Sequence, residues 1–308
     1  MRLVFAGTPD VALPSLVALT AAGHELVAVV TRPPAAQGRH RRLVPSPVQQ
    51  WAAERGIEVL APTSPRDPQF AQQLSALAPD CCPVVAYGGL IPADLLDLPA
   101  KGWINLHFSL LPAYRGAAPV QRAILDGATT TGATTFRIVE ALDAGPIYGQ
   151  LTVPVGPRTT SGELLAQLAE QGAGLLVEAV AAAAAGQMPR PQPSDNVSWA
   201  PKITVAEVEV DWQAPVDQID RLIRAANPEP GAWTSVAGRR LVIRRAEPTD
   251  QTLPPGQIAI TKKAVVVGTG SAGLRLLDVV PAGKRPMAAA DWARGLPSAG
   301  PWRAGSDD

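Results

Sequence analysis

The sequence has few of the residues on which metal and thiol chemistry depend. Among 308 residues there are only two cysteines, Cys81 and Cys82, and because they are adjacent within an apolar run we interpret them as small buried hydrophobic residues. A structural zinc site needs four ligands, and no Cys/His spacing supplies them, so we expect no bound metal. Only three histidines are present, His24, His40 and His107, which makes the search for a general acid or base short.

Long hydrophobic runs and an excess of one charge are also missing. The most apolar stretch, residues 175–185, is mostly alanine and is interrupted by Glu178, so it is a poor candidate for spanning a bilayer. The apolar run at residues 3–6 is too short for the core of a signal peptide. We therefore expect a cytoplasmic protein with no membrane contact. The 27 Lys and Arg residues balance 27 Asp and Glu residues, so any RNA partner would have to bind a local basic patch.

The first 187 residues alternate between short apolar runs and amphipathic helical patterns. This alternation predicts an α/β domain with a Rossmann-like, mostly parallel sheet covered by helices on both faces. The long helix near 161–185 has Ser161 as its expected cap. Strands are predicted near 3–6, 25–30, 57–60, 81–86, 103–106, 133–139 and 147–155, and helices near 11–22, 48–55, 66–77, 92–98, 119–125 and 161–185.

The pattern changes at a proline-rich segment that begins after Gln187. We interpret residues 188–206 as an extended linker between a catalytic domain at 1–187 and a C-terminal domain at 207–308. Short β-like runs separated by Gly and Pro turns predict that the second domain is a small, OB-like β-barrel. Its strands are expected near 233–236, 241–245, 257–260, 264–267 and 274–279, and its helices near 216–226 and 288–294.

Polar residues follow the predicted strand at 103–106. Ligands of open α/β sheets bind beyond the carboxyl ends of strands, and with a period of two Asn105, His107 and Ser109 can point to the same side. A solvated strand end would explain the same residues. Asp143 lies in a turn, where it could simply cap its own backbone or fold back against His107, orient the ring and favour its protonated form.

Residues 105–112 (Asn-Leu-His-Phe-Ser-Leu-Leu-Pro) and 114–121 (Tyr-Arg-Gly-Ala-Ala-Pro-Val-Gln) closely resemble the signature of the methionyl-tRNA formyltransferase family. Further stretches are similar to landmarks of that family in the same order, so the resemblance covers nearly the whole chain. These stretches are residues 5–10, 45–48, 84–88 and 282–287.

The resemblance implies transfer of a formyl group from 10-formyltetrahydrofolate to the amino group of initiator methionyl-tRNA. It implies that Asn105, His107 and Asp143 are catalytic. Asn105 and a protonated His107 would stabilise the negative charge that develops on the formyl oxygen, and Asp143 would keep His107 charged and assist proton transfer. The folate is implied to lie beside two segments, formed by Ser109, Leu110, Leu111 and Pro112 and by Tyr87, Gly88, Gly89 and Leu90. Leu110 and Leu111 could equally be ordinary core residues.

A basic cluster, Arg39, Arg41 and Arg42, occupies the segment after the second predicted strand. Such a cluster is usually a solvated surface, but in the resembled family this insertion enters the acceptor arm of the tRNA. Guanidinium groups suit phosphates and splayed bases. We expect a monomeric enzyme. Weaker candidates for further phosphate contacts are Arg239, Arg240, Arg244, Arg245, Lys262 and Lys263; in each adjacent pair we expect one residue to face inward or along an edge.

Departures from the family pattern keep other readings open. Phe108 stands where relatives often carry a small residue, and Pro146 is closer to the glycinamide ribonucleotide formyltransferases. The alternative enzyme functions are therefore three: a glycinamide ribonucleotide formyltransferase, a sugar-nucleotide formyltransferase and a formyltetrahydrofolate hydrolase domain. A catalytically silent RNA- or nucleotide-binding protein is the alternative from another class, and the intact Asn105, His107 and Asp143 set argues against it.

Overall fold

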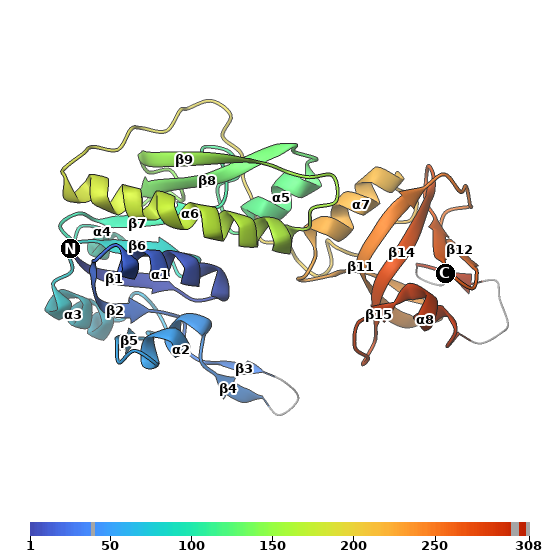
Figure 1. Ribbon diagram of the computed structural model, residues 1–308, viewed down its shortest axis with the longest axis horizontal. Helices are drawn as coiled ribbons and strands as arrows, with labels where there is room; N and C mark the ends of the chain where they lie inside the picture. The colour runs from blue at the N-terminus through green and yellow to red at the C-terminus, as the bar shows by residue number, and fades with distance from the viewer. Residues whose placement is uncertain (38–40, 297–301, 306–308) are drawn as a thin grey trace. The chain divides into compact units, whose positions relative to one another are not determined.

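The computed structural model describes residues 1–37, 41–296 and 302–305. The chain folds into two compact units (Figure 1), each of which draws on more than one segment. The first unit consists of Met1–Pro119, Thr130–Pro154 and Leu165–Ala200. The second unit consists of Val120–Thr129, Val155–Leu164 and Pro201–Asp308.

The first unit is built on a seven-stranded sheet with the order β5-β2-β1-β6-β7-β8-β9. The five strands from β5 to β7 are parallel, whereas β8 and β9 are antiparallel additions at one edge. The strand order reverses between β1 and β6, which is the place where open α/β sheets form ligand crevices. The strands are β1 (Arg2–Gly7), β2 (Glu25–Val30), β5 (Glu58–Leu60), β6 (Cys82–Val85), β7 (Trp103–His107), β8 (Thr130–Arg137) and β9 (Ile147–Pro154).

Helices cover both faces of this sheet. Phe70 of α3 and Leu95 of α4 share one buried cluster with Trp103 of β7. Because side chains alternate along a strand, Leu106 points to the opposite face, and there it lies against Gly172 of α6, where an added Cβ would be 3.0 Å from its side chain. The helical elements of the first unit are η1 (Asp10–Ala12), α1 (Leu13–Ala21), α2 (Pro47–Ala53), α3 (Pro68–Leu77), α4 (Ala93–Leu96) and most of α6 (Ser161–Ala184). Helix α5 (Pro119–Leu125) belongs to the second unit from Val120 onward.

The long helix α6 is apolar enough, by length and composition, to cross a membrane. Its apolar residues nevertheless include fully buried side chains such as Leu168 and Leu176, and it runs along the sheet (Figure 1) in the manner of a core helix. Its cap differs from the expected Ser161. The Thr160 N–H donates to Glu163 Oε2 at 2.9 Å, and the Glu163 N–H donates to Thr160 Oγ1 at 3.3 Å. The capping box therefore begins one residue earlier, which gives Glu163 its proper spacing.

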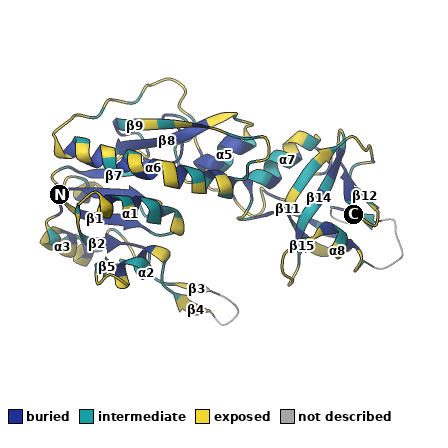
Figure 2. Ribbon diagram, in the orientation of Figure 1, coloured by how far each residue is buried: buried dark blue, intermediate teal, exposed yellow. Residues whose placement is uncertain are grey.

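A short hairpin, which sequence reasoning did not predict, projects after β2. Strands β3 (Ala35–Gln37) and β4 (Arg42–Val44) pair with each other and, among the described residues, with no other strand. Figure 1 shows the hairpin extending away from the sheet near α2, and Figure 2 shows its exposed surface. The hairpin thus carries Arg41 and Arg42 on an exposed arm of the first unit.

The second unit contains an antiparallel sheet that curls toward a barrel, as predicted. A bridge between Val236 and Ala304 and a hydrogen bond from the Gly305 N–H to the Ser235 carbonyl at 3.0 Å link the two ends of the sheet. Helix α7 (Val216–Ala225) buries Ile219 and Ile223, and α8 (Ala289–Ala293) is the second predicted helix. The strand order is β10 (Ala232–Val236), β11 (Arg239–Thr249), β14 (Gly273–Pro281), β13 (Val265–Gly268), β12 (Gln257–Ile260) and β16 (Trp302–Arg303), with β15 (Met287–Ala288) paired to β14.

Candidate active site

Strand β7 carries the first two residues of the predicted set. Asn105 lies opposite Val84 of β6 and Phe136 of β8, and His107 lies opposite Thr134 of β8. Alternation along the strand places Asn105 and His107 on the face opposite to the one covered by α6. The strand ends at His107, so the ring is delivered to the carboxyl edge of the parallel strands.

The imidazole of His107 is held on both sides. Its Nε2 lies 2.9 Å from the carbonyl oxygen of Tyr114. A carbonyl only accepts hydrogen bonds, so Nε2 carries a proton and Nδ1 is the nitrogen that is free to exchange one. Nδ1 lies 3.8 Å from Oδ2 of Asp143, and the ring meets Phe136 edge-on with centroids 6.4 Å apart. The structure therefore brings together two residues that are far apart in sequence.

Burial sets the resting charge of this ring. His107 is only 6% exposed, and the loss of hydration lowers its pKa below the ordinary value. The Asp143 carboxylate and the Tyr114 carbonyl act in the opposite direction and offset only part of this effect. The Asp143 carboxylate thus favours the charged form of the ring, as expected, but burial has the larger effect on the pKa, because desolvation acts on the whole ring whereas the carboxylate lies beyond hydrogen-bond distance. Burial therefore favours the neutral form of the ring.

Asp143 does not cap its own turn but is held by a distant loop. Its Oδ2 accepts a hydrogen bond from the Gly116 N–H at 2.8 Å, and its backbone has a φ of 48°, in the left-handed region. The turn is tightly fitted: a Cβ at Gly145 would be 1.7 Å from the Arg137 carbonyl oxygen, and one at Gly116 would be 2.7 Å from that of Ala200. The two glycines allow the close approach that brings the carboxylate to the ring.

The carboxamide of Asn105 forms no hydrogen bond with any residue that the structure describes. Asn105 is partly buried within β7, two residues before the strand ends, and its side chain offers two N–H donors and one carbonyl acceptor. A buried polar group without a partner is costly, so this half-buried amide is well suited to receiving a substrate oxygen.

The first predicted folate segment is largely internal. Ser109 is fully buried, and its hydroxyl donates to the carbonyl of Ala113 at 2.6 Å. Leu111 packs with Phe136 and Ile147 in the core, so the ordinary core reading fits its side chain. Folate contacts of this segment would therefore fall on its backbone and on the half-buried Leu110.

The second predicted folate segment follows β6 at the reversal of the strand order. Tyr87 is 2% exposed and its hydroxyl has no hydrogen-bond partner within the described chain. The Thr8 hydroxyl donates to the Tyr87 carbonyl at 2.8 Å and so joins this turn to the end of β1. Leu90 is 77% exposed, which makes it the apolar side chain of this turn that is accessible to a flat ligand.

The basic residues lie on exposed surfaces. Arg41 and Arg42 are exposed on the β3–β4 hairpin, and Arg39 lies outside the described residues. In the second unit Arg239 and Arg240 are both exposed, so neither of them faces inward, because the strand begins there beyond the core. Arg244 donates to the Asn227 side chain and the Pro228 carbonyl, Arg245 pairs with Asp278, and Lys262 and Lys263 are exposed.

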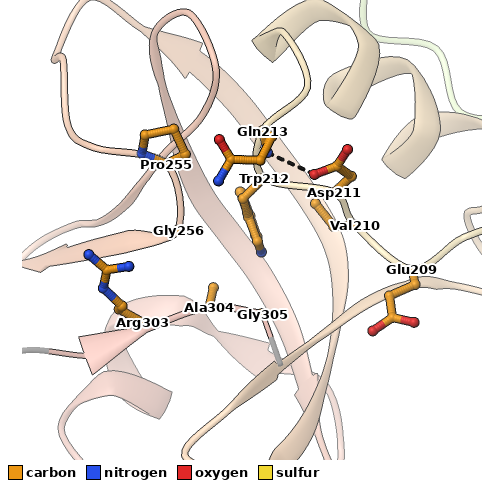
Figure 3. Close-up of a pocket in the computed structure, with 10 residues that line it drawn as sticks. All are labelled: Glu209, Val210, Asp211, Trp212, Gln213, Pro255, Gly256, Arg303, Ala304 and Gly305. Carbon is orange, nitrogen blue, oxygen red and sulfur yellow. Dashed lines mark hydrogen bonds between the residues drawn. The ribbon is translucent and has the colours of Figure 1, made fainter. Parts of the chain in front are cut away.

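One hollow of the chain contains none of these residues. It lies in the second unit, has a volume of about 630 Å³ and is shown in Figure 3. Its charged residues, Glu209, Asp211 and Arg303, form no ion pair with one another, and the Asp211 carboxylate accepts a hydrogen bond from the Gln213 N–H at 2.9 Å. Its lining contains no histidine or cysteine.

Within the described residues, no group of three or more His, Cys, Asp or Glu side chains is arranged so that it could hold a metal ion. Burial raises the pKa of the Cys81 thiol to about 12, so this sulfur is a poor nucleophile. Sequence reasoning missed the roles of Tyr114 and Gly116 as partners of His107 and Asp143. Their contacts are made by backbone atoms, for which the residue type gives no signal.

Comparison with known proteins finds two matching domain families. Residues 1–180 match the family described as "Formyl transferase" and residues 202–297 match "Formyl transferase, C-terminal domain". A methionyl-tRNA formyltransferase of Thermobifida fusca is 59% identical over 298 residues, which cover 96% of each chain.

Two solved structures share the fold. A methionyl-tRNA formyltransferase from Clostridium thermocellum has a TM-score of 0.56 at 14% identity and covers 80% of this chain and 93% of its own. HypX from Aquifex aeolicus, in complex with tetrahydrofolic acid, has a TM-score of 0.63 at 19% identity over 94% of this chain, which spans 46% of that protein. With two matching domain families and a relative that is similar over nearly its full length, this chain belongs to the methionyl-tRNA formyltransferase family.

Proposed function

We propose that this chain transfers the formyl group of 10-formyltetrahydrofolate to the free amino group of initiator methionyl-tRNA, and that Asn105, His107 and Asp143 carry the reaction. The 59% identity to a methionyl-tRNA formyltransferase supports the acceptor and the donor. The observation that carries the site assignment is the approach of His107 Nδ1 to Asp143 Oδ2 at 3.8 Å. His107 lies on the same strand as Asn105, whose carboxamide forms no hydrogen bond with the described residues.

In the first step the amine attacks the formyl carbon, and negative charge develops on the formyl oxygen. The Asn105 N–H groups make no hydrogen bond within the described chain, so they are available to donate to this oxygen. One such donor typically contributes about 2.7–4 kcal/mol of transition-state stabilisation. No covalent intermediate with the protein is required, because positioning of the two substrates supplies much of the remaining rate enhancement.

The proton of the attacking amine passes to His107. Nε2 is occupied by the Tyr114 carbonyl, so Nδ1 of the neutral ring accepts the proton. The imidazolium that forms is stabilised by Asp143 on one side and by the Tyr114 carbonyl on the other. As the carbon–nitrogen bond to the folate breaks, the same proton moves to the leaving nitrogen, directly or through a water molecule. The new amide bond and tetrahydrofolate are the products.

Residues on the β3–β4 hairpin provide the contact with the tRNA acceptor arm in this proposal. Arg41 and Arg42 are exposed, as phosphate contacts require, and Arg39 belongs to the same basic cluster. One chain supplies all three residues of the reacting set, which supports action as a monomer. Formylation of initiator tRNA takes place where translation starts, which favours the cytoplasm.

The function is tested by formyl transfer to charged initiator tRNA with 10-formyltetrahydrofolate as donor. We expect activity in the unmodified chain and a loss of about 10²–10⁴-fold in kcat for His107→Ala, whereas His24→Ala, a second partly buried histidine, retains full activity. Transfer to glycinamide ribonucleotide or an amino-sugar nucleotide with no transfer to tRNA would refute the acceptor. Full activity of His107→Ala would refute the site.

A further inference from the structure

The proline-rich segment after α6 contains two side chains that turn inward from an otherwise exposed run. Residues 190–199 are exposed except for Gln192 and Ser198. Ser198 lies against the loop that holds His107: its hydroxyl accepts from the Tyr114 N–H at 2.8 Å, and its carbonyl accepts from the Arg115 N–H at 2.9 Å. The segment therefore forms part of the scaffold around the reacting residues and is more than a spacer.

Gln192 makes the more specific contact. Its Nε2 donates to the carbonyl oxygens of Asp143 and Gly145, both at 2.8 Å. These hydrogen bonds span 49 and 47 positions in the sequence. Both N–H groups of the amide are thus used on the turn that presents the Asp143 carboxylate.

The orientation of this amide is fixed by its other end. Gln192 Oε1 accepts a hydrogen bond from Arg115 Nη2 at 2.7 Å. A flipped amide would place its NH₂ group against the guanidinium and its oxygen against two carbonyls, so the network admits one orientation only. Arg115 is anchored in turn, because its backbone N–H and C=O both pair with the segment at Ser198 and Ala200.

The turn needs such support. Asp143 has a φ of 48°, and a non-glycine residue in the left-handed region persists where the surroundings hold it there. We propose that Gln192 is a positioning residue for Asp143: its amide group fixes the turn of residues 143–145, so that the carboxylate stays beside the His107 ring. The role in catalysis rests on the proposed function, whereas the placement of the carboxylate does not.

Titration of His107 tests the placement without any substrate. In the described chain Asp143 is the only carboxylate within ion-pair distance of the ring, and its charge raises the pKa of His107. Gln192→Met keeps the length of the side chain and removes all of its hydrogen bonds. We expect the pKa of His107, followed by NMR, to fall in Gln192→Met and to stay unchanged in Gln187→Met, a change at an exposed glutamine just before this segment. With three histidines in the chain, the His107 signal is assigned by its loss in His107→Asn.

A double-variant comparison separates positioning from a general effect on the fold. In the Asp143→Asn background the charge is already absent, so Gln192→Met should cause no further fall in the pKa of His107. Thermal melting of each variant checks folding, and Gln192→Ala replaces Gln192→Met should the latter not fold.

Kinetics then give the catalytic consequence. A misplacement of about 1 Å in a catalytic group typically costs about 100-fold, so we expect kcat to fall about 10- to 100-fold in Gln192→Met with an unchanged KM for the folate. An unaltered His107 titration in Gln192→Met, or an equal fall in pKa with and without Asp143, would overturn the proposal. Absence of formyl transfer by the unmodified chain would refute the proposed function and leave the titration result standing.

Discussion

Replacing Gly145 with alanine should uncouple the Asp143 turn from strand β8. A Cβ at this position would lie 1.7 Å from the carbonyl oxygen of Arg137, half of the 3.4 Å at which ordinary contact begins. The neighbour is backbone in the sheet and cannot rotate away, so the turn must shift by more than 1 Å, a distance of roughly the size that costs about 100-fold in rate. That factor corresponds to about 2.7 kcal/mol in the activation free energy.

Steady-state kinetics with tRNA and folate, together with denaturant unfolding, measure this effect. We expect kcat and kcat/KM of Gly145→Ala to fall together, because Asp143 acts on the transition state more than on substrate binding. Overpacking should also reduce the free energy of unfolding by about 1–3 kcal/mol. Gly174→Ala is the matched control, since that helical glycine has open space around it and alanine is the better helix former. A Gly145→Ala enzyme with unchanged kcat would refute the view that this turn must stay close to β8.

Three further outcomes can be checked. Because the folded state lowers the pKa of His107, the unfolded chain binds that proton more readily. The free energy of unfolding should therefore fall as the pH drops below about 6.5. Urea titrations across this range should show a weaker dependence of the unfolding free energy on pH for His107→Asn. Thr160→Ala removes the capping box of α6 and should lower the free energy of unfolding by about 1 kcal/mol, measured in the same way; a loss no larger than that of an exposed mid-helix substitution would contradict the cap. The double variant Arg41→Ala, Arg42→Ala should raise KM for tRNA and leave KM for folate unchanged. The slope of log affinity for tRNA against log salt concentration should decrease in magnitude by about 0.7–0.9 per lost phosphate contact. The control variant Arg66→Ala should change none of these quantities.

Local sequence pattern was sufficient for most elements of the fold. Helix α5 and strand β12 have the predicted bounds, and the start of α6 agrees, because apolar periodicity and flanking Pro or Gly are encoded within a few residues. The predicted fold class is confirmed. The β3–β4 hairpin was missed because its strands are only three residues long, too short for an alternating pattern to appear.

The candidate site was predictable only in part, for a physical reason. Asn105, His107 and Asp143 came from a resemblance in residue types, which specifies side chains. The contacts that orient them are made by the Tyr114 carbonyl and the Gly116 N–H, and every residue has these groups. The lowering of the His107 pKa by burial was not foreseen either, since burial of the ring is a property of the tertiary structure.

The backbone pairing of Arg115 with Ser198 and Ala200 determines where this enzyme can be divided. A fragment that stops at Gln187 would keep all three reacting residues but would lose one half of that pairing, leaving the loop around His107 without its neighbour. In a chimaera that exchanges the barrel for one from another member of the family, the joint therefore belongs after Ala200, where the first compact unit ends.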